Sequence, residues 1–206
     1  LSRFVLVTRH PAECEELQGM LAPAGLTVRA YPVLRVAEVA DEEEWARVLA
    51  EVPFGRDDAW LALASPRAPA RFASSCRARG AQHLLRLPAA AVGETTAHAA
   101  AAAGLRVELV GPGTGGGLGE GMLERLAPAS SVIFARGRDV RPELPSLLVG
   151  AGHSVLPLTV YRMDPTPPRE LPPLGPSLEA VVLTSPRAAE LDLRGVGGLP
   201  LPCPHW

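Results

Sequence analysis

The chain of 206 residues contains no lysine and no asparagine, so arginine supplies all 20 of its basic side chains. Without lysine it cannot form a Schiff base with a carbonyl substrate or use the phosphate-binding lysine of P-loop proteins and protein kinases. The formal net charge is only −2 and the two signs are interspersed, without the basic stripe typical of nucleic-acid-binding proteins. We therefore expect no nucleic-acid partner, whereas single arginines are well suited to holding a small anion.

Cysteine, clustered histidine and long apolar runs are also scarce. Cys14, Cys76 and Cys203 lie far apart and form no CxxC pair, and the five histidines are equally scattered. Neither a disulfide framework nor a metal site is expected. The alanine-rich run at 97–105 falls short of the roughly 20 apolar residues that a membrane span needs. The first residues enter an apolar strand without the features of a signal peptide, so we expect a cytoplasmic chain with no membrane partner.

The sequence repeats itself. An apolar stretch that runs into Ser-Pro-Arg-Ala occurs at 61–68 and again at 181–188. A second pair of segments, 5–33 and 132–161, each leads from one apolar strand through Ala-Gly into another. The repetition predicts two related halves, and a cleft between two lobes is a natural place for a ligand.

Apolar β-rich runs alternate with helical patterns along the chain. This alternation predicts an α/β fold, with parallel sheets covered by helices. One stretch departs from it, because residues 111–121 are rich in glycine. We predict a mobile turn there, followed by a helix over 120–126.

The repeat also predicts how the chain is divided into domains. Two segments of alternating polarity, 34–39 and 158–164, are expected to pair as a two-stranded hinge. Domain 1 is then discontinuous, formed by residues 1–33 and 165–206, and domain 2 comprises residues 40–157. The second copy of the repeat stops before its last strand and helix, so we expect the first lobe to be truncated at its C-terminal end.

Hydroxyl and guanidinium side chains follow the predicted strands. Ligands of parallel sheets gather at the carboxyl ends of the strands, and the free N–H groups of a helix that starts there favour an anion. For any single turn, a hydroxyl group is more often a helix cap than a ligand-binding group. Turns of this kind recur in both halves, however, and this recurrence favours binding of a carboxylate or a phosphate. The candidate binding residues are Arg9, Ser65, Arg67, Thr95, Thr96, Arg136, Ser185 and Arg187.

One aromatic residue is a candidate for acid catalysis. Tyr161 is one of only two tyrosines and lies in a predicted hinge strand, where its phenol can donate a proton to a leaving hydroxide. An aromatic side chain that simply fills a strand face is an equally good explanation. A serine hydrolase is not expected, because neither Ser65 nor Ser185 has GxSxG surroundings.

The order of several short motifs resembles the uroporphyrinogen-III synthase family. The motifs are VLVTR at 5–9, YPV at 31–33, SPRA at 65–68, VGETTA at 92–97, GMLERL at 121–126 and LPLTVYR at 156–162. The resemblance implies two α/β lobes joined by a two-stranded ladder, with the first lobe built from both chain ends. It also implies a hydro-lyase of haem and porphyrin biosynthesis that cyclises hydroxymethylbilane to uroporphyrinogen III. In that reaction the terminal pyrrole is inverted through a spiro intermediate without a metal or cofactor.

The resemblance gives roles to single residues as well. Tyr161 corresponds to the tyrosine that assists loss of the hydroxyl group, Thr95 and Thr96 to a threonine turn, and Ser65 and Ser185 to serines that line the cleft. The partner it implies is a small-molecule substrate, a linear tetrapyrrole polycarboxylate, and we expect a monomer. The alternative from another class is a two-lobed binding or regulatory protein that holds a small polyanion without converting it.

Overall fold

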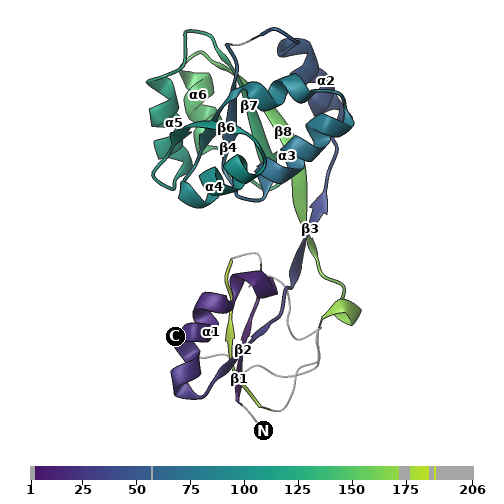
Figure 1. The fold of residues 1–206 in the computed structure, drawn as a ribbon, viewed down its shortest axis with the longest axis vertical. Coiled ribbons are helices and arrows are strands. Elements are labelled where there is room, and N and C mark those ends of the chain that lie inside the picture. The colour runs from purple at the N-terminus through teal and green to yellow at the C-terminus, as the bar shows by residue number, and fades with distance from the viewer. Residues whose placement is uncertain (1–2, 57, 172–176, 186–187, 189–206) are drawn as a thin grey trace. The chain divides into compact units, whose positions relative to one another are not determined.

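The structure, a computed structural model, has two compact units that are each built on a mainly parallel sheet. It describes residues 3–56, 58–171, 177–185 and 188. Unit 1 comprises Leu1–Val36 and Met163–Trp206, and unit 2 comprises Ala37–Arg162. Figure 1 shows the strands of unit 2 between layers of helices. The predicted α/β class with parallel sheets is confirmed.

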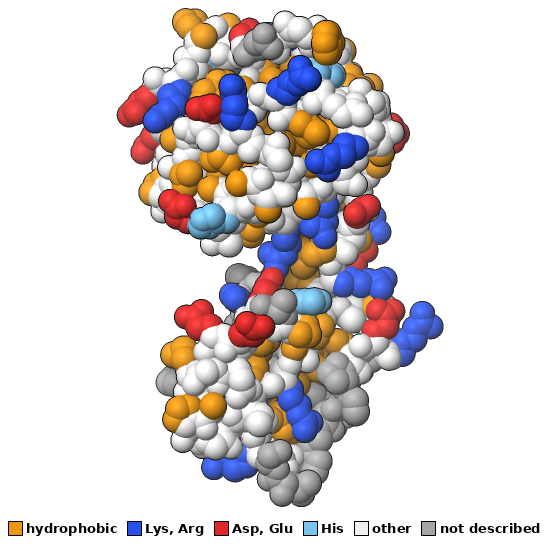
Figure 2. All heavy atoms as spheres, in the orientation of Figure 1, with side chains coloured by type: hydrophobic (Ala, Val, Ile, Leu, Met, Phe, Trp, Pro, Cys, Tyr) orange, Lys and Arg blue, Asp and Glu red, His pale blue; other side chains and the backbone are white. Residues whose placement is uncertain are grey.

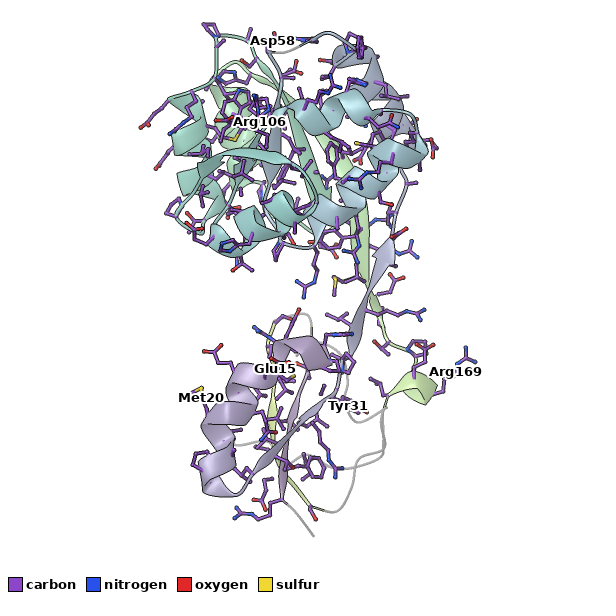
Figure 3. All side chains as sticks on the ribbon, in the orientation of Figure 1. Glu15, Met20, Tyr31, Asp58, Arg106 and Arg169 are labelled. Atoms are coloured by element: carbon purple, nitrogen blue, oxygen red, sulfur yellow. The ribbon has the colours of Figure 1, made fainter. Side chains whose placement is uncertain are left out.

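Unit 1 contains a three-stranded parallel sheet in the order β2-β1-β9. The strands and helices that the structure describes in this unit include β1 (Phe4–Val7), β2 (Thr27–Ala30), β9 (Leu178–Val182), α1 (Glu15–Leu21) and the short 3₁₀ helices Pro11–Glu13, Ala22–Ala24 and Pro168–Glu170. Strand β1 is buried along its whole length because side chains cover both faces of the sheet. Leu17 and Leu21 of α1 pack on one face, whereas Met20 points away and is 69% exposed (Figure 3).

Unit 2 is built on a six-stranded sheet in the order β3-β8-β7-β4-β5-β6. The strands are β3 (Leu34–Glu38), β4 (Trp60–Leu63), β5 (Pro88–Ala91), β6 (Arg106–Val110), β7 (Ser131–Gly137) and β8 (Ser154–Pro165). The pairs from β8 to β6 are parallel. Strands β3 and β8 are neighbours in the sheet, and the boundary between the two units falls within both of them. That these two strands act as a hinge stays a prediction.

Helices cover both faces of the unit 2 sheet. They are α2 (Glu42–Glu51), α3 (Ala68–Ala78), α4 (Glu94–Ala102), α5 (Gly115–Leu123), α6 (Glu143–Gly150) and a 3₁₀ helix at Gln82–Arg86. Leu118 of α5 and Leu144 of α6 pack into one core cluster with Phe134 of β7. Trp45 of α2 stacks on Phe72 of α3, with 6.3 Å between the ring centroids. Figure 1 shows α5 and α6 on one side of the sheet and α2 and α3 on the other.

The prediction of a mobile turn over 111–121 is wrong, because most of this stretch belongs to helix α5. The Thr114 hydroxyl accepts a hydrogen bond from the Gly117 N–H and so caps the helix at its start. The glycines allow close packing: a Cβ at Gly119 would lie 2.6 Å from Leu147 Cδ2 of α6. Glycine has low helix propensity, but tertiary packing outweighs it here.

Charged side chains are spread over the surface. Figure 2 shows acidic and basic groups interspersed on the visible face of unit 2. Over the part of the chain that the structure describes, no helix combines the length and the hydrophobicity needed to cross a membrane.

Candidate functional site

A pocket of about 520 Å³ lies within unit 2 at the carboxyl end of its sheet. Its walls come from the segments that follow β4, β5 and β6, from the end of β7, from the start of α6 and from Tyr161 of β8. This is the edge at which ligands of parallel sheets bind, and the volume is within the range of small-molecule sites. Of the residues predicted from the sequence, the structure brings Ser65, Arg136 and Tyr161 together around this pocket.

Tyr161 and Ser65 form a hydrogen-bonded pair in the pocket wall. The Tyr161 hydroxyl donates to Ser65 Oγ over 2.9 Å. The tyrosine side chain is largely buried, with 9% of the residue exposed, and the Arg71 guanidinium carbon lies 5.9 Å from its ring centroid. A phenol in this position is shielded from bulk water while its oxygen stays at the pocket, as a general acid requires.

The last residue of β7, Gly137, determines where the Tyr161 ring lies. Gly137 is opposite Tyr161 in the register of β7 and β8. A Cβ at Gly137 would lie 2.7 Å from Tyr161 Cζ and 2.9 Å from its Cε2, closer than real contacts allow. The ring therefore occupies space that any other residue at position 137 would fill.

Ser65 is held by the turn that starts helix α3. Its Oγ accepts a second hydrogen bond, from the Arg67 backbone N–H over 3.2 Å, and its carbonyl accepts the N–H of Ala68. The Arg67 carbonyl in turn accepts a hydrogen bond from the Arg71 guanidinium over 2.8 Å. These contacts fix the serine side chain in one position at the edge of the pocket.

Arg136 reaches the pocket from β7 and is paired with a buried carboxylate. Its Nη2 lies 3.2 Å from Glu44 Oε1, with side-chain exposures of 20% and 9% for the arginine and the glutamate. The Thr159 backbone N–H and hydroxyl both donate to the same carboxylate. Arg136 Nη1 also donates to the carbonyls of Gly137 and Arg138. Several contacts therefore hold the guanidinium in place, which favours a fixed position over free movement in solvent.

The rim of the pocket carries charge and free backbone donors. Arg141, Asp139 and Glu143 line it and are exposed. Gly115 and Gly116 line it as well, in the first turn of α5, where N–H groups have no partner within the helix. Backbone N–H groups and a guanidinium together suit carboxylate side arms.

The other candidates in unit 2 lie outside the pocket wall. Thr95 is exposed in the first turn of α4, and Thr96 is only 2% exposed. Arg67 is half-buried, and its backbone rather than its side chain makes the contact to Ser65. None of these three lines the pocket, and their role in binding stays a prediction.

The remaining candidates belong to unit 1. Arg9 is exposed and lies 4.0 Å from a carboxylate oxygen of Glu13. Ser185 Oγ accepts the N–H of Ala188 over 3.1 Å, the pattern of a helix cap. Arg187 lies outside the described residues.

The repeated Ser-Pro-Arg-Ala motif has different surroundings in the two units. In unit 1 the residue before the serine is Thr184, whose Oγ lies 3.3 Å from that of Thr8. In unit 2 the corresponding residue is Ala64, and the serine is bonded to a tyrosine instead. The hydroxyl pair therefore includes the serine of the motif in unit 2, whereas in unit 1 it is formed by Thr8 and the residue before the motif.

Metal-ligating side chains are dispersed over the described part of the chain, and the thiols there are buried. No three His, Cys, Asp or Glu side chains among the described residues are gathered as a metal site needs. Burial raises the pKa of the Cys76 thiol from 9.0 to about 12, which leaves it protonated and unreactive at neutral pH. Desolvation raises the pKa of Cys14 as well.

Sequence reasoning missed Glu44. The residue belongs to an acidic run, Asp41 to Glu44, that is typical of a solvated helix start. Its helical spacing to the buried Val48, one turn later, places it on the buried face, and this was a usable signal. It gave no indication of the partner, because Arg136 lies 92 positions away in the sequence.

Comparison with known proteins gives one family. A family model described as "Uroporphyrinogen-III synthase HemD" matches residues 15–197. A search among curated proteins found no match.

The fold of this chain is similar to the folds of several solved structures. A mutant uroporphyrinogen III synthase from the extremely thermophilic bacterium Thermus thermophilus matches with a TM-score of 0.62 and 21% identity, over 95% of this chain and 77% of that one. The wild-type Form-2 crystal of the Thermus enzyme matches with a TM-score of 0.51 and 24% identity, over 81% and 64%. Uroporphyrinogen-III synthetase from Helicobacter pylori matches with a TM-score of 0.53 and 15% identity, over 96% and 90%.

Proposed function

Because the chain belongs to the uroporphyrinogen-III synthase HemD family, we propose that it cyclises hydroxymethylbilane to uroporphyrinogen III, with inversion of the terminal pyrrole. The reaction is of the hydro-lyase type, since a hydroxyl group leaves as water before the ring closes. The observation that carries the proposal is the Tyr161 hydroxyl at the unit 2 pocket, bonded to Ser65 Oγ over 2.9 Å. Membership of the family would also be compatible with an inactive relative that lacks a proton donor. The Tyr161–Ser65 pair provides a proton donor and therefore supports an active enzyme.

The chemical demand on the protein is a proton and an orientation. Departure of hydroxide from the substrate carbon needs a proton on the oxygen, and a partly buried phenol at the pocket is the group best suited to supply it. The cation left behind is stabilised by the pyrrole nitrogen of the substrate itself. The protein then has to hold the terminal ring so that this ring attacks the cation through its substituted carbon, which is mainly a matter of positioning.

Binding of the acidic side arms is assigned to the polar groups around the pocket. Arg136 is fixed by Glu44, so its remaining N–H groups have a defined direction. Arg141 and the N–H groups of Gly115 and Gly116 add donors along the rim. Donors that are already fixed can position the substrate, because the protein side chains lose little conformational entropy when the substrate binds. From unit 1 and from outside the pocket, we retain Arg9, Arg67, Thr95, Thr96, Ser185 and Arg187 as proposed contacts.

The decisive experiment gives the complete chain freshly prepared hydroxymethylbilane, oxidises the products and separates the porphyrin isomers by chromatography. We expect the type III isomer to exceed the type I isomer, which forms spontaneously without enzyme. A heat-denatured sample is the matched control and should yield type I alone. If the native chain also yields type I alone while still binding the product, the protein is a binding protein rather than a synthase.

The cellular setting belongs to the same proposal. We propose a cytoplasmic monomer that acts on a small-molecule substrate, without a nucleic-acid or membrane partner. Light scattering coupled to size-exclusion chromatography, with and without product, tests the oligomeric state.

A further inference from the structure

We infer that Ser65 donates a proton to the leaving hydroxyl group and that Tyr161 reprotonates Ser65. The two residues then act as a proton relay, rather than Tyr161 acting alone. The inference rests on the proposed function and names a second catalytic residue for it. Its basis is the direction of each hydrogen bond at Ser65.

A serine hydroxyl has one donor hydrogen and two acceptor lone pairs. At Ser65 both acceptor positions are used, by the Arg67 N–H over 3.2 Å and by the Tyr161 O–H over 2.9 Å. Ser65 also lines the pocket. Its own O–H hydrogen is therefore the one left to point at a ligand, whereas the Tyr161 hydrogen points at Ser65.

The surroundings keep this direction fixed. The Arg67 N–H is a backbone donor and cannot reverse its role, so one lone pair of Ser65 is permanently taken. The Tyr161 ring is confined between its own strand and Gly137, whose missing side chain leaves just the space that the ring fills. A proton from Tyr161 therefore reaches a ligand in the pocket most directly through Ser65 Oγ.

The step balances in protons and electrons. The Ser65 O–H proton moves to the substrate hydroxyl, and the carbon–oxygen bond breaks with its electron pair on the oxygen, which leaves as water. The Tyr161 proton moves to Ser65 Oγ at the same time, which leaves a phenolate. When the attacking pyrrole regains its aromaticity after ring closure, it releases a proton, which returns through Ser65 to Tyr161.

A proton inventory on the unaltered protein tests the relay directly. Single-turnover rates are measured in mixtures of H₂O and D₂O, because single turnovers isolate the chemical step from product release. Two protons moving together give a curved dependence of rate on the deuterium fraction, and this is the expected result. A straight line means that one proton moves and overturns the relay.

Variants provide a second readout that does not depend on isotopes. Ser65→Ala and Tyr161→Phe should each lower kcat by about 10²-fold, the usual contribution of a proton donor. The double variant should lose little more than either single one, since the two residues act as a unit. Ser65→Thr keeps the hydroxyl and should recover most of the rate. Ser74→Ala, at an exposed serine of α3, is the matched control and should behave as the unaltered chain does.

Each outcome separates the relay from the function on which it rests. If the unaltered chain makes the type III isomer but Ser65→Ala keeps its kcat within about threefold, the relay is wrong and the synthase activity stands. Losses that multiply in the double variant, or a change in KM without a change in kcat, also overturn it. If the unaltered chain makes type I only, the proposed function fails and the relay fails with it. Should Ser65→Ala not fold, the proton inventory decides alone.

Discussion

The hydroxyl group of Tyr161 donates to Ser65 Oγ over 2.9 Å, although 96 positions separate the two residues in the sequence. The contact crosses a strand, because β7 lies between β8, which carries Tyr161, and β4, which leads to Ser65. Gly137 of β7 lies opposite Tyr161 and has no side chain in the way. The pair therefore depends on a third position that makes no hydrogen bond to either side chain.

Gly137→Ala is expected to displace the Tyr161 ring and to lower kcat at least tenfold. The new methyl group would overlap Cζ and Cε2 of the ring, so the phenol has to move away from Ser65. Overpacking of this kind also costs about 1–3 kcal/mol of unfolding free energy. The measurement combines single-turnover kinetics with urea unfolding.

The matched control for that change is Gly150→Ala at the end of α6, where an added Cβ meets nothing within 4 Å. This variant should keep its kcat and lose no stability, because alanine is at least as favourable as glycine in a helix. A Gly137→Ala protein with unaltered turnover would show that the ring position is not needed.

Much of the fold could be predicted because local pattern and final structure agree. The alternation of apolar runs with helical patterns predicts parallel sheets, and strands of both units pair in parallel. Ser65 and Tyr161 were each predicted separately as site residues, from the end of a strand and from the rarity of tyrosine. Their pairing could not be predicted, because it depends on the order of three strands and on their register.

Helix α5 marks where local reasoning fails. Its first residues, Gly115 to Gly117, predict a turn by propensity, whereas the Thr114 cap and packing against α6 and the sheet stabilise a helix. The buried ion pair of Glu44 and Arg136 was missed for a similar reason, since an acidic helix start is normally solvated. In both cases a distant segment decides the local structure.

Removal of the charge on Glu44 should destabilise unit 2. Glu44→Gln leaves the Arg136 guanidinium without its counter-ion at a position where side-chain exposure is 20%. Loss of one partner from a largely buried pair costs about 3 kcal/mol, which urea unfolding measures. Turnover should fall as well, because Arg136 loses its fixed position at the pocket.

Glu43→Gln removes a charge from the exposed neighbouring position of the same helix and should change the unfolding free energy by less than about 0.5 kcal/mol. A double variant in which Arg136 is also replaced by Gln should recover part of the loss, since no unpaired charge remains. Equal stability of the Glu43 and Glu44 variants would contradict the assigned pairing.

Neighbouring glycines of α5 should respond to alanine with opposite signs. A Cβ at Gly117 would collide with the ring of Pro112, and that rigid ring cannot move aside easily. We expect Gly117→Ala to cost about 1–3 kcal/mol. Gly116→Ala meets nothing within 4 Å and should stabilise the helix by about 0.5 kcal/mol. Thermal unfolding distinguishes the two variants, and a loss of stability in both would refute the packing explanation.

The stability of the chain should fall in alkaline solution through Cys76. Burial raises the pKa of this thiol from 9.0 to about 12 in the folded state, so above pH 9 the unfolded chain loses a proton that the folded chain keeps. Its contribution is therefore complete below pH 9 and is lost as the pH rises toward 12, by up to about 1.4 kcal/mol per pH unit. Urea unfolding at pH 8 and pH 10.5 measures the loss. Cys76→Ala lacks the thiol and should show a smaller decrease over the same interval, whereas equal decreases in both proteins would mean that Cys76 does not carry the effect.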